Sequence, residues 1–130
     1  MRYALLNLLA CPMCKNFPLE LTIFELKKFE KEYKVAKPFC DTYCARHKEY
    51  IKNLNVNNLE CEECVKEDVV NGILFCSKCG RWYPIIEGIP FMYPDSRRQH
   101  PRVKSKEDEF LRKFWSLIPD NIKERIKATT

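Results

Sequence analysis

The residues with the clearest capacity for chemistry are eight cysteines, which fall into four close pairs along the chain. Three of the pairs enclose two residues and one encloses three; the pairs are Cys11/Cys14, Cys40/Cys44, Cys61/Cys64 and Cys76/Cys79. A tight turn between two cysteines can direct both thiolates at one ion, which is what a metal site requires. Scattered cysteines are instead typical of the disulfide framework of a secreted domain. The pairing therefore favours metal ligands.

The first and last pairs have the residue types of zinc knuckles. Their sequences are Cys11-Pro12-Met13-Cys14 and Cys76-Ser77-Lys78-Cys79-Gly80. Proline predisposes the first knuckle to turn, and the glycine can adopt the positive φ that lets backbone N–H groups point at thiolate sulfurs. Four thiolates make a closed tetrahedral site with no position for water, so we predict a structural zinc ion there. Iron in a rubredoxin-like site is one alternative, and metal-free thiols, buried or oxidised, are the other.

The two inner pairs, Cys40/Cys44 and Cys61/Cys64, allow three interpretations. Spacings of four and three residues would place each pair on one face of a helix. Two antiparallel helices could then form Cys40–Cys64 and Cys44–Cys61 disulfides, although disulfides are rare in the cytosol outside hyperthermophiles. The four thiols could instead bind a second zinc ion, or they could be free and buried. The sequence leaves these readings open.

The elements that must position these cysteines follow from the apolar periodicity. Between residues 17 and 23 the apolar side chains recur at every second position, which predicts a half-buried strand. From about Glu25 they take a helical spacing, and residues 40–52 are predicted to form a second helix. Strand character then returns and ends in a hairpin over residues 82–92, which turns at Glu87-Gly88.

We therefore predict an α+β fold in which a small zinc ribbon, a short antiparallel sheet, carries the two outer knuckles. Residues 1–94 form the ribbon domain, with a helical insertion at about residues 25–65 between the knuckles. Residues 95–130 form a basic linker and a C-terminal amphipathic helix, for which Ser105 and Asp108 are a predicted capping box. Pro119 ends the helix, whose apolar stripe consists of Phe110, Leu111, Phe114, Trp115 and Ile118.

The net charge of +5 is concentrated at the C-terminal end of the chain. Residues 97–130 contain ten basic and five acidic side chains, whereas residues 1–96 are balanced. A direct nucleic-acid-binding domain of this size is usually basic across its whole binding face. Only the tail is suited to phosphate contacts, for which the candidates are Arg97, Arg98, Arg102, Lys104 and Lys106.

The segment from Trp82 to Ile86 is apolar on both faces. In an extended strand Trp82 and Ile86 lie on one face, and Tyr83 and Ile85 lie on the other. The core of so small a domain can cover only one of these faces. The other must be covered by the insertion, by the C-terminal helix or by another chain, because large exposed apolar patches usually mark interfaces.

Two stretches of the sequence closely resemble the multifunctional methyltransferase subunit family. They are Asn7-Leu8-Leu9-Ala10-Cys11-Pro12 and Cys76-Ser77-Lys78-Cys79-Gly80-Arg81-Trp82-Tyr83-Pro84-Ile85-Ile86-Glu87-Gly88-Ile89-Pro90. The resemblance covers roughly residues 1–24 and 66–93, and longer members of the family also have a helical insertion between the knuckles. This chain departs from the family in its second cysteine quartet and in its helix-bearing tail.

Members of that family are small zinc-ribbon activators of tRNA, rRNA and release-factor methyltransferases. The resemblance implies a non-catalytic subunit that binds an S-adenosylmethionine-dependent methyltransferase as a heterodimer and covers an apolar surface of that partner. It would pair a ribbon strand with the partner's sheet and reach nucleic acid only through the partner. Together with the two-sided strand, it predicts a partner-binding surface made of Leu8, Leu9, Trp82, Tyr83, Ile85 and Ile89.

The sequence offers little material for catalysis, and we do not expect an enzyme. The two histidines, His47 and His100, stand outside any recognisable constellation, and three glycines leave little for a phosphate-binding loop. No apolar run approaches the roughly 20 residues that span a bilayer, and the expected location is the cytoplasm. The alternative function is a zinc-ribbon nucleic-acid-binding protein that uses the basic tail.

Overall fold

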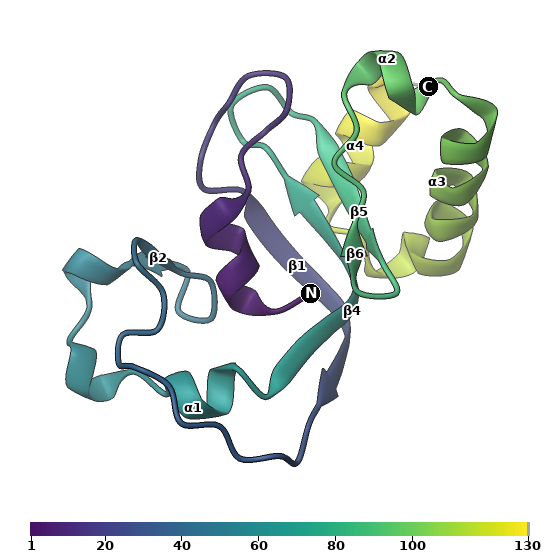
Figure 1. Cartoon of the computed structure of the whole chain (residues 1–130). Coiled ribbons are helices and arrows are strands. Elements are labelled where there is room, and N and C mark those ends of the chain that lie inside the picture. The colour runs from purple at the N-terminus through teal and green to yellow at the C-terminus, as the bar shows by residue number, and fades with distance from the viewer. Residues whose placement is uncertain (130) are drawn as a thin grey trace.

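The computed structural model describes residues 1–129, and its centre is a four-stranded antiparallel sheet (Figure 1). The strand order is β1-β4-β5-β6, where the strands are β1 (Glu20–Lys28), β4 (Glu67–Phe75), β5 (Trp82–Ile86) and β6 (Ile89–Pro90). A separate hairpin pairs β2 (Tyr43–Cys44) with β3 (Glu49–Tyr50). With several helices around the sheet, the predicted α+β class is confirmed.

The helices are short and lie mostly at the two ends of the chain. The longest, α3, has 14 residues, and none within residues 1–129 is long and apolar enough to cross a bilayer. The α-helices are α1 (Cys61–Cys64), α2 (Asp95–Arg98), α3 (Pro101–Phe114) and α4 (Asp120–Thr129). The 3₁₀-helices are η1 (Tyr3–Leu8), η2 (Ile51–Asn53), η3 (Val56–Asn58) and η4 (Trp115–Leu117).

The predicted hairpin after the second knuckle is confirmed. Strands β5 and β6 pair through Ile85 with Pro90 and through Ile86 with Ile89. Glu87 and Gly88 both have positive φ, which the favoured two-residue hairpin turn requires. The turn therefore fixes the register of the edge strand β6 against β5.

The sheet is covered on both faces, so the two-sided apolar strand β5 is buried on both. Tyr83 and Ile85 pack on one face against residues of η1 and the first knuckle. Trp82 packs on the other face against α3 and α4, which lie together on that side of the sheet (Figure 1). Of the three covers that the sequence allowed for this face, the C-terminal helices are the one present.

The apolar stripe of the C-terminal helix is the surface that makes this cover. Phe110 and Phe114 are buried and stack on Phe24 of β1 with ring centroids 6.0 and 5.5 Å away. The predicted capping box is wrong, because α3 begins at Pro101 and Ser105 lies inside the helix. The cap is instead His100, whose Nδ1 accepts a hydrogen bond of 3.2 Å from the backbone N–H of Arg102.

The predicted helical insertion at about residues 25–65 is largely wrong. Strand β1 continues to Lys28, because Glu25–Lys28 pairs with the first half of the long strand β4 across a bulge. From residue 29 to residue 60 the only regular elements are the β2–β3 hairpin and the short 3₁₀-helices η2 and η3, and α1 is the single α-helical turn of the insertion. Sheet pairing with β4 therefore overrides the helical spacing of the apolar residues after Glu25.

The second predicted helix, over residues 40–52, is replaced by the β2–β3 hairpin because a distant side chain fixes the backbone. The side chain of Asn7 accepts a hydrogen bond from the N–H of Tyr43 and donates one to its carbonyl oxygen, each of 2.8 Å. It also accepts one of 3.2 Å from the N–H of Thr42. These bonds hold Tyr43 in the extended conformation, which local sequence spacing cannot reveal.

Arg98 links two C-terminal helices to each other and to the sheet. Arg98 of α2 lies 2.8 Å from the carboxylate of Glu107 of α3, and both side chains are largely buried. The Arg98 guanidinium also donates to the carbonyl oxygen of Trp82 at 2.6 Å and lies 4.5 Å from the centre of that indole ring. Burial raises the pKa of the Glu107 carboxyl despite the hydrogen bond from Arg98. Without Arg98, burial would favour the protonated form of Glu107 even more strongly.

We predict that Arg98→Ala lowers the free energy of unfolding by about 3 kcal/mol or more, because it leaves Glu107 buried without its cation. Chemical denaturation followed by tryptophan fluorescence measures the loss. Arg97→Ala is the matched control, since Arg97 is exposed on the same helix, and it should change stability by less than about 0.5 kcal/mol. Equal effects of the two variants would contradict the role given to Arg98.

Candidate metal centre

The four cysteines of the outer knuckles converge at one point. Their sulfur atoms all lie within 4.8 Å of one another. The Sγ atoms of Cys11 and Cys79 are 3.6 Å apart, and those of Cys14 and Cys76 are 3.4 Å apart. A tetrahedral zinc ion with Zn–S bonds of about 2.3 Å holds its sulfurs about 3.8 Å apart. The cluster therefore has the dimensions of a four-thiolate metal site.

The two knuckles reach this geometry with the same backbone turn. In each, the carbonyl of the first cysteine accepts a hydrogen bond of 2.8 Å from the residue four positions later, Lys15 or Gly80. Both of these residues have positive φ, 66° and 76°. The second knuckle is the connection between β4 and β5, and the first lies between η1 and β1. The sheet thus brings together cysteines that are far apart in the sequence.

Tyr83 stabilises a thiolate at this site. Its hydroxyl lies 3.2 Å from the Sγ of Cys11, and both groups are fully buried. Burial alone disfavours ionisation of Cys11, but hydrogen bonds from Tyr83 and from the backbone amides of Cys14 and Met13 lower its pKa to about 6. Burial also raises the pKa of Tyr83, so the hydroxyl stays protonated and donates. Burial raises the pKa of Cys76 to about 12, so this thiol is protonated at neutral pH in the metal-free protein.

Two arginines contact the second knuckle. Arg81 hydrogen-bonds the Cys79 thiol with its side chain and forms an ion pair of 2.7 Å with Asp95. Arg125 of α4 donates to the carbonyl oxygen of Cys79 at 2.8 Å. A Cβ atom on Gly80 would overlap the Arg125 guanidinium, which is the end of a flexible side chain, so the positive φ is the stronger reason for glycine there. Neither arginine was predicted from the sequence to contact the site, although Arg81 directly follows the knuckle.

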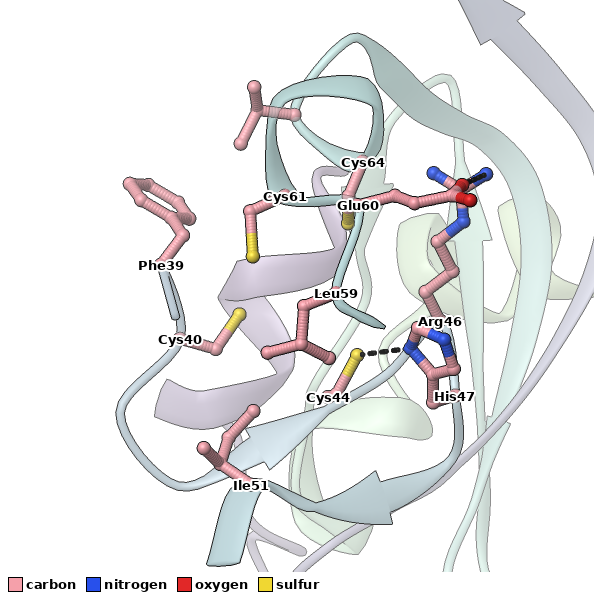
Figure 2. A pocket seen from close by; sticks show the side chains of 11 residues that line it. Phe39, Cys40, Cys44, Arg46, His47, Ile51, Leu59, Glu60, Cys61 and Cys64 are labelled. Carbon is pink, nitrogen blue, oxygen red and sulfur yellow. Dashed lines mark hydrogen bonds and ion pairs between the residues drawn. The ribbon is translucent and has the colours of Figure 1, made fainter. Parts of the chain in front are cut away.

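The inner quartet lies apart from this centre, in the insertion. The side chains of Cys40, Cys44, Cys61 and Cys64 line one small pocket (Figure 2). Cys44 belongs to β2 and Cys40 precedes it, whereas Cys61 and Cys64 are the first and last residues of α1. All four are free thiols. Burial and the neighbouring thiols raise the pKa of Cys64 to about 12, and burial with the same kind of neighbours raises that of Cys40.

The predicted partner-binding residues divide into exposed and buried ones. Leu8 is 81% exposed and Ile89 is 61% exposed, while Leu9 is partly buried. The other three, Trp82, Tyr83 and Ile85, are buried inside the chain: Trp82 under the C-terminal helices, Tyr83 against the thiolates and Ile85 in the core. The strand supports the surface but does not form it in this conformation.

The predicted phosphate-contacting residues divide in the same way. The side chains of Arg97, Arg102, Lys104 and Lys106 are exposed on α2 and α3. Arg98 differs from them because it is engaged with Glu107 and Trp82. A basic surface of four side chains therefore remains in the tail.

A family model described as Trm112p-like protein matches residues 2–88, about two-thirds of the chain. The match includes both outer knuckles, the insertion and the sheet up to the β5–β6 turn. It ends before α2, so the helices that cover Trp82 lie outside the matched region. No curated protein matches the chain.

We predict that Cys76→Ser removes the metal from this centre and unfolds the sheet around it. Structural zinc contributes roughly 10 kcal/mol or more to the folding of small domains, and Cys76 is fully buried. Elemental analysis and circular dichroism of the purified variant measure both losses. Ser77→Ala, at an exposed position of the same knuckle, is the control and should keep metal and fold. A folded Cys76→Ser variant with full metal content would disprove the assignment.

We also predict that Tyr83→Phe weakens metal binding about tenfold while the fold is kept, because the ring still packs and only the hydrogen bond to Cys11 is lost. Groups that orient and charge a metal ligand typically cost 10- to 100-fold in affinity when removed. Competition with a chelator of known affinity measures the change. Unaltered affinity in a folded variant would show that the hydroxyl does not act on the thiolate.

Proposed function

Because the chain belongs to the Trm112p-like family, which its two knuckle motifs resemble, we propose that it is a non-catalytic activating and stabilising subunit of S-adenosylmethionine-dependent methyltransferases. Family membership implies a methyltransferase-associated activator role. The finer proposal is that the partner enzymes act on tRNA, rRNA or a translation release factor, in the cytoplasm. The observation that carries it is the match over residues 2–88, which contains the whole outer cysteine quartet and three of the four strands of the sheet.

The chemistry of the outer quartet supports a structural role for the metal, which we propose is zinc. Four thiolates complete a tetrahedral shell, and a closed shell leaves no position at which water could be activated. When bound, the ion would tie the β4–β5 connection to the segment between η1 and β1. The chain would then act on its partner by contact, through surfaces that this centre holds rigid.

We propose that Leu8 and Ile89, with Leu9, are the exposed part of the docking surface for the methyltransferase. Leu8 and Ile89 are the two most exposed large apolar side chains among the described residues. Covering them with an apolar surface of the partner would stabilise both proteins. Binding to the native partner alone would also shift the partner's folding equilibrium by mass action.

A strand of the sheet is available for the backbone pairing that the family implies. The outer edge of β5 carries little free backbone, because Arg98 bonds the carbonyl of Trp82 and the N–H of Phe91 bonds that of Pro84. Strand β1 is nine residues long and has a neighbour in the sheet on one side only. An added partner strand would therefore pair with β1, where Leu26 is 45% exposed.

We predict that the double variant Leu8→Asp and Ile89→Asp weakens association with the methyltransferase at least about tenfold, since two carboxylates would enter an apolar interface. Co-purification of the tagged chain with its partner from the native cell, followed by titration of the isolated pair, measures the change. Leu117→Asp is the matched control: Leu117 is 54% exposed but lies in η4, far beyond the end of the matched region, which Ile89 directly follows. Metal content should be the same in all three proteins.

Three outcomes would contradict the proposal. Methyl transfer by the isolated chain would make it an enzyme. Tight binding of RNA without a partner, weakening steeply as salt rises, would favour the alternative in which the basic tail contacts phosphates. Weakened association in Leu117→Asp alone would move the docking surface to the C-terminal helices.

A further inference from the structure

We propose that Cys40, Cys44, Cys61 and Cys64 form a second zinc site, which holds the insertion together. The first observation is convergence: the four side chains come from two separate segments and line one small pocket (Figure 2). Each segment contributes two cysteines with a short spacing, as at the outer centre. None of the four is in a disulfide.

The second observation is that the insertion lacks a core of its own. Between residues 29 and 66 only Tyr43, Cys44, Ala45 and Leu59 are buried. The elements there are strands of two residues and helical turns of three or four. Ordering so many residues carries a large entropic cost that this little apolar burial does not offset. Small folds with too little core are commonly held by a metal or a cross-link, and the quartet joins the hairpin to α1 where such a link is needed.

The surroundings of the pocket suit a negatively charged site. Four thiolates around one Zn²⁺ carry a net charge of about −2. Arg46 lines the pocket, and its guanidinium lies 3.4 Å from both Glu60 and Glu67. The Nδ1 atom of His47 lies 3.2 Å from the Sγ of Cys44, close enough to donate a hydrogen bond to a thiolate (Figure 2). His47 can therefore support the charge without entering the coordination shell, whereas the charge of Arg46 is already shared with the two glutamates.

Among the described residues, the outer quartet is the only group of three or more candidate ligands that converges within 4.8 Å, so the inner sulfurs lie farther apart than the outer ones. Closing onto a zinc ion would need rotation of cysteine side chains toward the middle of the pocket. In the binding step, Zn²⁺ replaces the thiol protons: four S–H bonds break, four Zn–S bonds form, and four protons pass to solvent. No electron is transferred, so the step needs no oxidant, whereas formation of two disulfides would.

The test is the zinc content of the full chain purified under reducing conditions, measured by elemental analysis against protein concentration. We expect two zinc ions per chain in the wild type and one in the double variant Cys40→Ser and Cys61→Ser, which removes one ligand from each segment. Thr42→Ala, at an exposed position between two of the cysteines, should keep two. His47→Ala removes a hydrogen bond to Cys44 but no ligand, so it should weaken zinc binding at this site while two ions still bind when zinc is in excess. One ion per chain in that variant with zinc in excess would overturn the four-thiolate ligand set.

A second measurement on the wild type keeps the proposal testable even if the double variant does not fold. Iodoacetamide should leave all eight cysteines unmodified while zinc is bound and should modify them after chelation in denaturant. One zinc ion per chain with the inner four cysteines alkylated would overturn the proposal. So would a mass lower by four hydrogens under non-reducing conditions, since that is two disulfides. Neither result depends on whether a methyltransferase binds, so the proposed function stands or falls separately.

Discussion

The convergence of the two outer knuckles is the constraint on which the rest of the structure depends. It joins the connection between β4 and β5 to the segment that follows η1. Tyr83 of β5 contacts the sulfur of Cys11, and Arg81, just before β5, contacts that of Cys79. Arg125 of α4 bonds the backbone carbonyl of Cys79. Without a cation the buried thiols Cys11 and Cys76 could not both be ionised, so the metal and the local fold require each other.

How much of this could be predicted from sequence depended on whether the signal was local. The outer quartet, the β5–β6 hairpin and the Phe110/Phe114 stripe each follow from short spacings, and all three are present. The helices predicted in the insertion failed because distant partners decide the backbone there: β4 extends β1, and Asn7 fixes Tyr43. Both contacts join residues that are far apart in the sequence, so local spacing cannot predict them.

Within strand β5, the sequence likewise predicted the local arrangement of side chains but not their distant partners. An alternating apolar pattern placed Tyr83 and Trp82 on opposite faces correctly, but it could not say what each face meets. Tyr83 meets a thiolate, and Trp82 meets Arg98 and the C-terminal helices. Leu8 and Ile89 were named with them as one surface, yet only these two remain strongly exposed. In this chain, a strand that is apolar on both faces is buried on both faces within the protein itself, so the pattern alone does not indicate an interface.

The order in which the sheet and its cover occur along the chain has a consequence for synthesis. Strand β5 ends at Ile86, whereas the covering side chains run from Phe110 to Ile126. At translation rates of roughly 5–20 residues per second, the face carrying Ile73, Phe75 and Trp82 is made seconds before the helices that seal it. During those seconds this apolar face of the nascent chain is not yet covered by its own helices. Any protein that binds the nascent chain at that stage therefore contacts an apolar face that is buried in the finished protein.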